Sequence, residues 1–244
     1  MGALLVCNAA AQERCKLTAI GTANVAVVRD GRTLLLADGR ELRLAAIEVA
    51  DGSRAALQAL VAGHPLRLER LGLERLGPEH DRYGRLVAFA FIGDARQSVQ
   101  QAMLEQGHAR VSARVGDKSC ADALLSAERA ARVARRGLWA DPNFAPLSAE
   151  NHTRLQAERG RFALVEGKVL SVRESGATIY VNFGRRWTRD FTVIILRRMQ
   201  RAFTAAGIEP KKLEGRRIRV RGWLEQRGGP IITAEAPEQI ELAD

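Results

Sequence analysis

Two Asp-Gly dipeptides constrain the fold of the first half of the chain more than any other feature. Asp30-Gly31 and Asp38-Gly39 separate three short apolar or alternating segments at 22–28, 34–36 and 41–44. Asp-Gly is typical of tight hairpin turns, because the central residues of such turns take a backbone conformation that Asp and Gly tolerate. The pattern therefore predicts a β-meander of three strands.

The rest of the first 142 residues mixes extended and helical patterns. Runs rich in Val, Ala and Phe predict further strands, and apolar residues at helical spacing predict three helices, the longest rich in alanine. A polar segment without a hydrophobic period then predicts a linker at 143–160. The predicted strands are 65–71 and 85–92, a brief extended segment is 109–115, and the predicted helices are 52–62, 97–106 and 121–136.

The segment from 161 to 244 predicts a second, smaller domain that is all-β with one helix. Three strand patterns, a helical pattern and two more strand patterns follow one another, which is the order of an OB barrel. The fold class is therefore mainly β (α+β), with two successive domains at 21–142 and 161–244. The predicted strands are 162–173, 177–183, 190–196, 216–225 and 230–242, and the predicted helix is 197–206.

The charge of the chain favours a polyanionic partner. The 244 residues hold 38 Lys and Arg against 28 Asp and Glu, a formal net charge of +10. Residues 161–244 hold 16 basic and 10 acidic residues, so this shorter segment carries +6 of the total. Such an excess attracts nucleic acid electrostatically, although an arginine-rich composition alone leaves the partner open.

Aromatic residues lie beside arginines at a predicted strand end in the second domain. Alternation places Tyr180 and Asn182 on one face of the strand, and Val181 and Phe183 on the other, toward the core. Exposed aromatic rings in a basic groove stack bases while arginines neutralise phosphates. We therefore expect a substrate-binding surface, with anionic glycans, phospholipid headgroups or a protein as alternative partners. Its predicted residues are Tyr180, Arg185, Arg186, Trp187 and Arg189.

The N-terminus predicts export. Residues 1–20 begin with a short apolar run that ends in small residues, similar to the end of a secretory signal with its cleavage site; a disordered leader is the alternative. We expect a periplasmic or secreted protein. Removal of the leader leaves Cys15 and Cys120, an even pair that predicts a disulfide in an oxidising compartment. No run of residues is long and apolar enough to predict a transmembrane segment.

Two separate stretches of the first domain combine arginines with carboxylates. Arg43 lies on a predicted strand that ends with Glu48 and Asp51, and Arg85 closes the sequence Asp-Arg-Tyr-Gly-Arg at 81–85. Guanidinium groups match phosphate oxygens in a bidentate way, and a carboxylate binds a cation or accepts a proton from water. Together these residue types indicate chemistry on a phosphate ester.

With these motifs, residues 23–142 resemble the staphylococcal nuclease (thermonuclease) family. The resemblance rests on the D-G-x-T turn at 30–33, the strand end at 43–48, the D-x-Y-G-R turn at 81–85 and the Gly-Leu-Trp sequence at 137–139. It implies a five-stranded OB barrel with three helices that hydrolyses DNA or RNA with one calcium ion. It also implies that Arg43 and Arg85 clamp the phosphate and that Tyr83 lies near the substrate.

The acidic positions depart from the family pattern. Arg32 stands where the family has a calcium-binding aspartate, and Glu48 and Asp51 stand where it has an aspartate and a glutamate. Calcium binds about six to eight oxygen ligands, so a guanidinium at this position disfavours it. We expect no cofactor, with calcium bound by Glu48 as the alternative. Asp51 is the candidate catalytic base, one methylene shorter than the usual glutamate, and small displacements of this kind slow catalysis.

These departures leave open whether the protein is an enzyme. We expect a thermonuclease-family protein that binds nucleic acid (DNA or RNA) or another polyanion, with hydrolysis weak, metal-independent or lost. The alternatives are an active secreted nuclease and a non-catalytic scaffold or binding module for a protein or anionic glycan. No Cys or His spacing suggests zinc, and neither a P-loop nor a Ser-His-Asp arrangement is indicated.

Overall fold

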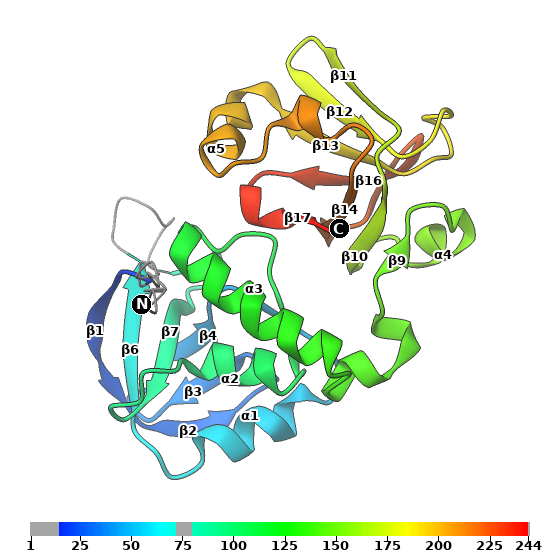
Figure 1. Ribbon diagram of the computed structural model, residues 1–244. Coiled ribbons are helices and arrows are strands. Elements are labelled where there is room, and N and C mark those ends of the chain that lie inside the picture. The colour runs from blue at the N-terminus through cyan, green and yellow to red at the C-terminus, as the bar shows by residue number, and fades with distance from the viewer. Residues whose placement is uncertain (1–14, 72–79, 244) are drawn as a thin grey trace, which may run out of the picture.

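The computed structural model describes residues 15–71 and 80–243 and shows a mainly β protein with helices packed on its sheets (Figure 1). This confirms the predicted mainly β, α+β class. Two large clusters of buried apolar side chains form separate cores, one from residues 28–127 and one from residues 147–240. We refer to residues 17–133 as the N-terminal unit and to residues 147–242 as the C-terminal unit.

The main sheet of the N-terminal unit has the strand order β1-β6-β7-β4-β3-β2. Its two edge strands, β1 and β2, are separated in sequence only by Asn24, so the sheet curves round on itself through one bent strand. The meander predicted around the two Asp-Gly turns is formed by β2, β3 and β4. The strands are β1 (Leu17–Ala23), β2 (Val25–Val28), β3 (Thr33–Leu36), β4 (Glu41–Leu44), β6 (Leu66–Leu71) and β7 (Leu86–Ile92).

In the described part of the N-terminal unit, three α-helices and a two-stranded ladder accompany the main sheet. Asp117 caps the longest helix, α3, by accepting hydrogen bonds from the backbone N–H groups of Ser119 and Cys120. The antiparallel β5–β8 ladder places Glu48 opposite Arg110. The elements are α1 (Ser53–Val61), α2 (Val99–Glu105), α3 (Lys118–Val133), β5 (Ile47–Val49) and β8 (Ala109–Val111).

The end of α3 lies earlier than the alanine-rich pattern predicts. The helix stops at Val133, and Arg135 takes a left-handed φ of 51°. Gly137 does not cap it but lies at a close backbone crossing. A Cβ on Gly107 would overlap the Arg136 carbonyl, and a Cβ on Gly137 would overlap the Gly107 carbonyl. Leu138 donates a hydrogen bond to the Gly107 carbonyl at 2.8 Å. The glycine pair therefore serves a close backbone crossing.

The C-terminal unit has two sheets, with orders β17-β14-β10-β9 and β11-β12-β13-β16-β15. Strand pairs β10–β11 and β14–β15 each continue from one sheet into the other with at most two residues between them. The elements are β9 (Leu147–Ser148), α4 (His152–Ala157), β10 (Phe162–Lys168), β11 (Ser171–Ser175), β12 (Thr178–Asn182), β13 (Thr192–Leu196), α5 (Gln200–Ala205), β14 (Arg217–Trp223), β15 (Glu225–Arg227), β16 (Gly229–Ala234) and β17 (Ile240–Leu242).

The two units share one pattern of strand pairing. In the N-terminal unit the bent first strand pairs with β3 and β6, and β4 runs parallel to β7. In the C-terminal unit the first strand, β10–β11, pairs with β12 and β14, and β13 runs parallel to β16. A helix, α1 or α5, precedes the fourth strand in each unit. The strand order that predicted an OB-like arrangement is thus present twice.

Two segment boundaries differ from the sequence analysis. The predicted linker, 143–160, contains β9 and α4, and the buried side chains of Leu147 and Leu155 belong to the C-terminal core. The segment is too short to show a hydrophobic period, yet it supplies an edge strand that runs parallel to β10. At the N-terminus, the predicted arm at 1–20 includes the start of β1; its first 14 residues, and with them the predicted leader, lie outside the described residues.

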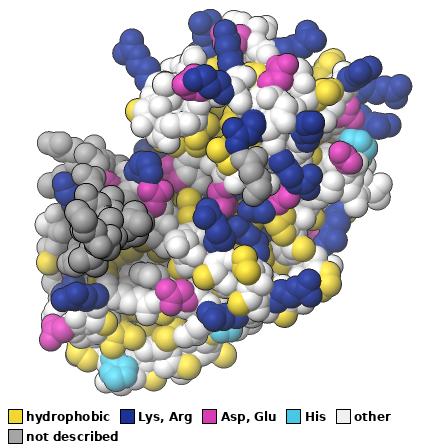
Figure 2. All heavy atoms as spheres, viewed as in Figure 1, with side chains coloured by type: hydrophobic (Ala, Val, Ile, Leu, Met, Phe, Trp, Pro, Cys, Tyr) yellow, Lys and Arg dark blue, Asp and Glu magenta, His cyan; other side chains and the backbone are white. Residues whose placement is uncertain are grey.

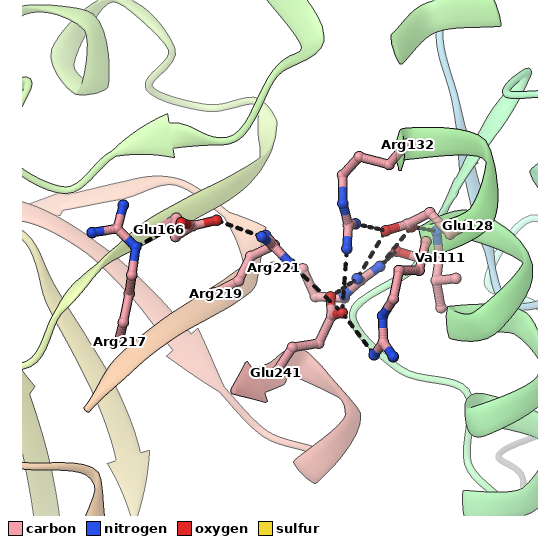
Figure 3. A network of polar contacts seen from close by, with 9 residues as sticks. Val111, Glu128, Arg132, Glu166, Arg217, Arg219, Arg221 and Glu241 are labelled. Carbon is pink, nitrogen blue, oxygen red and sulfur yellow. Dashed lines mark hydrogen bonds and ion pairs between the residues drawn. The ribbon is translucent and has the colours of Figure 1, made fainter. Parts of the chain in front are cut away.

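A buried ionic cluster joins the two units (Figure 3). Arg221 of β14 is fully buried and donates to Glu128 of α3 at 2.8 and 3.0 Å, to the Val111 carbonyl at 3.1 Å, and to Glu241 of β17. Arg132 of α3 also binds Glu128, at 2.8 Å. We call these residues, Glu128, Arg132, Arg221 and Glu241, the junction cluster. It fixes α3 and β8 of one unit against β14 and β17 of the other.

A disulfide joins Cys15 to Cys120, as the sequence predicts, and ties the start of the N-terminal unit to α3. It closes a loop with a sequence separation of 105 residues, so it restricts the unfolded chain strongly. We expect reduction to lower the free energy of unfolding by about 2–4 kcal/mol. Denaturant unfolding with and without reductant measures this. Two free thiols from Cys15 and Cys120 in the unreduced protein would contradict the pairing.

Within the described residues, no helix has the length and apolar character needed to span a membrane.

Candidate nucleic-acid interface

The two predicted clamp arginines come from neighbouring parallel strands. Arg43 lies on β4 opposite Val87 of β7, and Arg85 immediately precedes β7. The 81–85 turn holds Arg85 in place, because Asp81 accepts from its Nε at 2.9 Å and pairs with its Nη2 at 2.7 Å. The same carboxylate accepts hydrogen bonds from the backbone N–H groups of Tyr83 and Arg85. The fold therefore places the two arginines at neighbouring positions of two adjacent central strands.

Arg32 reaches the carboxylate of Glu48 from the first Asp-Gly turn. Asp30 accepts hydrogen bonds from the backbone N–H groups of Arg32 and Thr33, each at 2.8 Å, which shapes this turn. The Arg32 Nη1 pairs with Glu48 and donates to the Ile47 carbonyl at 3.2 Å. Gly31 allows this turn to pack closely against Ser53 at the start of α1, because a Cβ at position 31 would lie only 2.7 Å from the Ser53 Cβ. Glu48 also lies 4.0 Å from Arg43.

These side chains form a half-buried cluster with an excess of positive charge. Burial lowers the pKa of Arg43 from its ordinary value, and the guanidiniums of Arg32 and Arg85 lower it further, while Glu48 and Asp81 raise it. For Asp81, burial raises the pKa, but its hydrogen bonds from Arg85 and the turn outweigh burial and lower it. Three guanidiniums thus face two carboxylates. We call Arg32, Arg43, Glu48, Asp81 and Arg85 the arginine cluster.

Two predicted residues lie at the margin of this cluster. Tyr83 is 67% exposed, and its ring packs against the Arg85 guanidinium, whose carbon lies 5.1 Å from the ring centroid. Asp51 is exposed in the turn between β5 and α1. Among the described residues, the ion pairs that hold Glu48 come from Arg32 and Arg43 and do not involve Asp51.

The second predicted surface lies on the C-terminal unit. Tyr180, Arg185 and Trp187 line one cavity of about 800 Å³ at β11 and β12. The predicted alternation is confirmed: Val181 is fully buried in the core, and Tyr180 pairs across the sheet with Arg173 on the cavity side. The cavity is lined by Leu170, Ser171, Arg173, Glu174, Ser175, Tyr180, Asn182, Gly184, Arg185 and Trp187.

Two further arginines of this prediction do not line the cavity. Arg189 is turned toward Asp190 and toward His152 of α4, with an Nη2 to Nε2 distance of 3.3 Å. The Arg186 backbone N–H donates to Asp190 at 2.8 Å, and its side chain is exposed. Lys and Arg side chains are also spread over the visible face of the C-terminal unit, above the N-terminal unit (Figure 2).

Sequence reasoning missed Arg110 and Trp223. Arg110, opposite Glu48 in the β5–β8 ladder, extends toward the C-terminal unit, where its guanidinium carbon lies 5.2 Å from the ring centroid of Phe162. The Phe162 ring also contacts Trp223 of β14, which is 51% exposed. The sequence does place Trp223 at the end of a predicted strand whose alternate residues are charged, which could have marked it as exposed. Its contact with Phe162 could not be predicted, because the two residues are distant in sequence.

A comparison with known protein families identifies a similarity for the segment that contains most of this site. Residues 45–141 match the family model described as staphylococcal nuclease homologue. This segment is similar to staphylococcal nuclease domains. The match contains Glu48, Asp81 and Arg85, whereas Arg32 and Arg43 precede it. A domain of this family indicates nucleic-acid binding or nuclease activity. A search of curated proteins finds no match.

Proposed function

We propose that this protein binds nucleic acid through the arginine cluster and the basic cavity of the C-terminal unit, with phosphodiester hydrolysis weak, metal-independent or lost. The arginine cluster has the chemistry of a phosphate site, because Arg43 of β4 and Arg85, just before the adjacent strand β7, offer guanidinium donors. The cavity adds Tyr180 and Trp187, whose rings suit base stacking.

The contact between Arg32 and Glu48 carries the proposal. In the family the corresponding positions supply two carboxylates to calcium. Here one is a guanidinium, whose Nη1 takes up both the Glu48 carboxylate and the Ile47 carbonyl. Calcium needs about six to eight oxygen ligands, and a cation beside these oxygens repels it. The residues present do not fit calcium, so we propose that Arg32 neutralises Glu48 in its place.

Loss of a metal ion would also weaken hydrolysis. A metal lowers the pKa of a bound water, whereas an ion pair between side chains does not activate water in this way. Asp51 is exposed and lies outside the arginine cluster, which leaves the candidate base poorly placed. The two effects favour a binding protein on a nuclease scaffold.

An active nuclease is the second candidate, and one observation favours it. Arg43 and Arg85 match the positions with which the family clamps the phosphate, and Arg43 lies on β4 while Arg85 immediately precedes the adjacent strand β7. Incubation of pure protein with single- and double-stranded DNA and RNA, in calcium, in other divalent ions and in chelator, separates the candidates. Salt-sensitive binding without cleavage supports the proposal. Cleavage that depends on calcium and is abolished in Arg85→Ala contradicts it.

Replacement of Arg32 tests the blocked metal position directly. We expect Arg32→Asp to bind calcium measurably in calorimetry, because it restores a carboxylate beside Glu48 and removes the competing cation. The unmodified protein should show no such heat. Arg29→Asp, which makes the same charge change at an exposed position beside Glu41, is the matched control. Equal calcium affinity in the unmodified protein and in Arg32→Asp would refute the blocking model.

We also propose that the protein acts outside the cytoplasm. The Cys15–Cys120 disulfide supports this, because disulfides persist in oxidising compartments.

A further inference from the structure

The region where the two units meet contains a cation and an exposed aromatic ring that the proposed function does not use. Arg110 leaves β8 on the same face of the ladder as Glu48, because directly opposed residues of an antiparallel pair share a face. Glu48 is already engaged by Arg32 and approached by Arg43. Arg110 is instead directed across the junction toward the C-terminal unit.

The guanidinium of Arg110 contacts two aromatic rings, and nearby carboxylates act on it without forming an ion pair. Burial lowers its pKa, while Glu128 and Glu48 raise it. Its carbon lies 5.2 Å from the ring centroid of Phe162 and 5.9 Å from that of Phe144. Among the described residues it makes no hydrogen bond or ion pair, and its Nε is buried without a partner. The residue as a whole is half-buried. The nearby Glu158 pairs with Arg161 at 3.5 Å.

Trp223 completes this region from the other side of Phe162. The two rings meet edge to face, with centroids 6.1 Å apart, and Trp223 remains 51% exposed. A phosphate donor and a stacking surface therefore flank the same phenylalanine, with the Arg110 carbon and the Trp223 centroid at most about 11 Å apart. The junction cluster holds β8 and β14, which carry these residues, in one arrangement.

We propose that Arg110 and Trp223 form a subsite for a single-stranded segment of nucleic acid that continues from the arginine cluster across the junction. This rests on the proposed function and names its substrate class. Arg110 binds a phosphate and Trp223 stacks on a base. The base must be unpaired and unstacked, because the faces of bases in a duplex are covered by their neighbours.

Tryptophan fluorescence tests the stacking directly, because the chain has three tryptophans in distinct settings. Trp139 is 7% exposed, whereas Trp187 and Trp223 are both exposed. In Trp187→Phe, we expect a single-stranded oligothymidylate of about 12 nucleotides to quench the Trp223 emission, and the matched duplex to leave it unchanged. Trp223→Leu should bind the single strand at least about fivefold more weakly, while Trp223→Phe keeps most of the affinity.

A second variant tests the phosphate contact. Arg110→Gln should make the logarithm of single-strand affinity fall less steeply with the logarithm of salt concentration, by about 0.7 in slope, because one phosphate contact is lost. Unchanged thermal unfolding midpoints for both variants show that folding is intact. One result overturns the subsite and leaves the proposed function intact: the affinity for the single strand is lost in Arg85→Ala but unchanged in Trp223→Leu and in Arg110→Gln.

Two other results also count against the inference. Equal weakening of duplex and single-strand binding in Trp223→Leu overturns the single-strand assignment. Absence of any nucleic-acid binding by the unmodified protein overturns the proposed function, and the subsite with it.

Discussion

Replacing Arg221 with methionine is expected to lower the free energy of unfolding by about 3–5 kcal/mol, because it leaves two carboxylates buried without their shared cation. Glu128 and Glu241 both bind the Arg221 guanidinium, which is fully buried, and the Val111 carbonyl loses a donor at the same time. Denaturant unfolding followed by circular dichroism measures the loss. We further expect the variant to unfold in two transitions where the unmodified protein unfolds in one, because the junction cluster couples the units.

The control for this prediction is Arg217→Met on the same strand. Arg217 is 57% exposed and pairs with Glu166 at 2.8 Å, so its loss should cost less than about 1 kcal/mol. Equal effects of Arg217→Met and Arg221→Met would show that the junction cluster does not hold the units together.

Acid should weaken the same junction in the unmodified protein. Burial raises the pKa of Glu241, but Arg221 and Arg132 outweigh burial and lower it from its ordinary value of 4.5. A carboxyl with a lowered pKa stabilises the fold above its ordinary pKa, and this contribution is lost as the pH falls through the folded-state pKa. Stability should therefore fall on acidification below about 4.5, with a smaller dependence in Arg221→Met.

Loss of either clamp arginine is expected to weaken nucleic-acid binding by about ten- to a hundredfold. Charge-assisted hydrogen bonds contribute about 1.5–3 kcal/mol each, and about 1.4 kcal/mol corresponds to a tenfold change in affinity. Arg43→Ala and Arg85→Ala should both show this loss when the anisotropy of a labelled oligonucleotide is followed. Arg85→Lys should recover part of it, because lysine keeps the charge without the bidentate geometry.

Arg40→Ala is the matched control for the clamp variants. Arg40 is half exposed in the β3–β4 turn, where it pairs with Asp38 at 2.7 Å. Its replacement by alanine removes one positive charge from the same meander, as Arg43→Ala does. A loss of affinity in Arg40→Ala as large as in Arg85→Ala would mean that binding follows net charge alone and that the arginine cluster is no specific site.

The sequence predicts features that depend on neighbouring residues. Asp-Gly turns predicted the meander, alternation predicted that Val181 is buried beside the accessible Tyr180, and the cysteine count predicted the Cys15–Cys120 bridge. The Arg32–Glu48 contact joins the first Asp-Gly turn to β5, the strand that follows the meander, so its partners are also near in sequence. Each of these features is encoded within a turn, a strand or a pair of residue types.

The features that escaped prediction are contacts between distant elements. In the sequence, Arg221 is one of several charged residues on an alternating basic strand. Its burial depends on contacts with Val111 and Glu128, which lie 110 and 93 residues earlier. Glu128 lies on an alanine-rich face that predicts apolar packing, yet it accepts from Arg221 and Arg132. Likewise, Arg110 acquires its role from Phe162 of the other unit. Such partners become visible only when the two units are packed together.

Equilibrium binding of the unmodified protein to a labelled single-stranded oligonucleotide, measured in chelator and again in calcium, tests the central claim most directly. The claim is that Arg32 has replaced the metal beside Glu48 and leaves an anion site that works without it. We predict the same salt-sensitive affinity in both solutions, lost in Arg85→Ala. Binding that appears only when calcium is present would contradict the account.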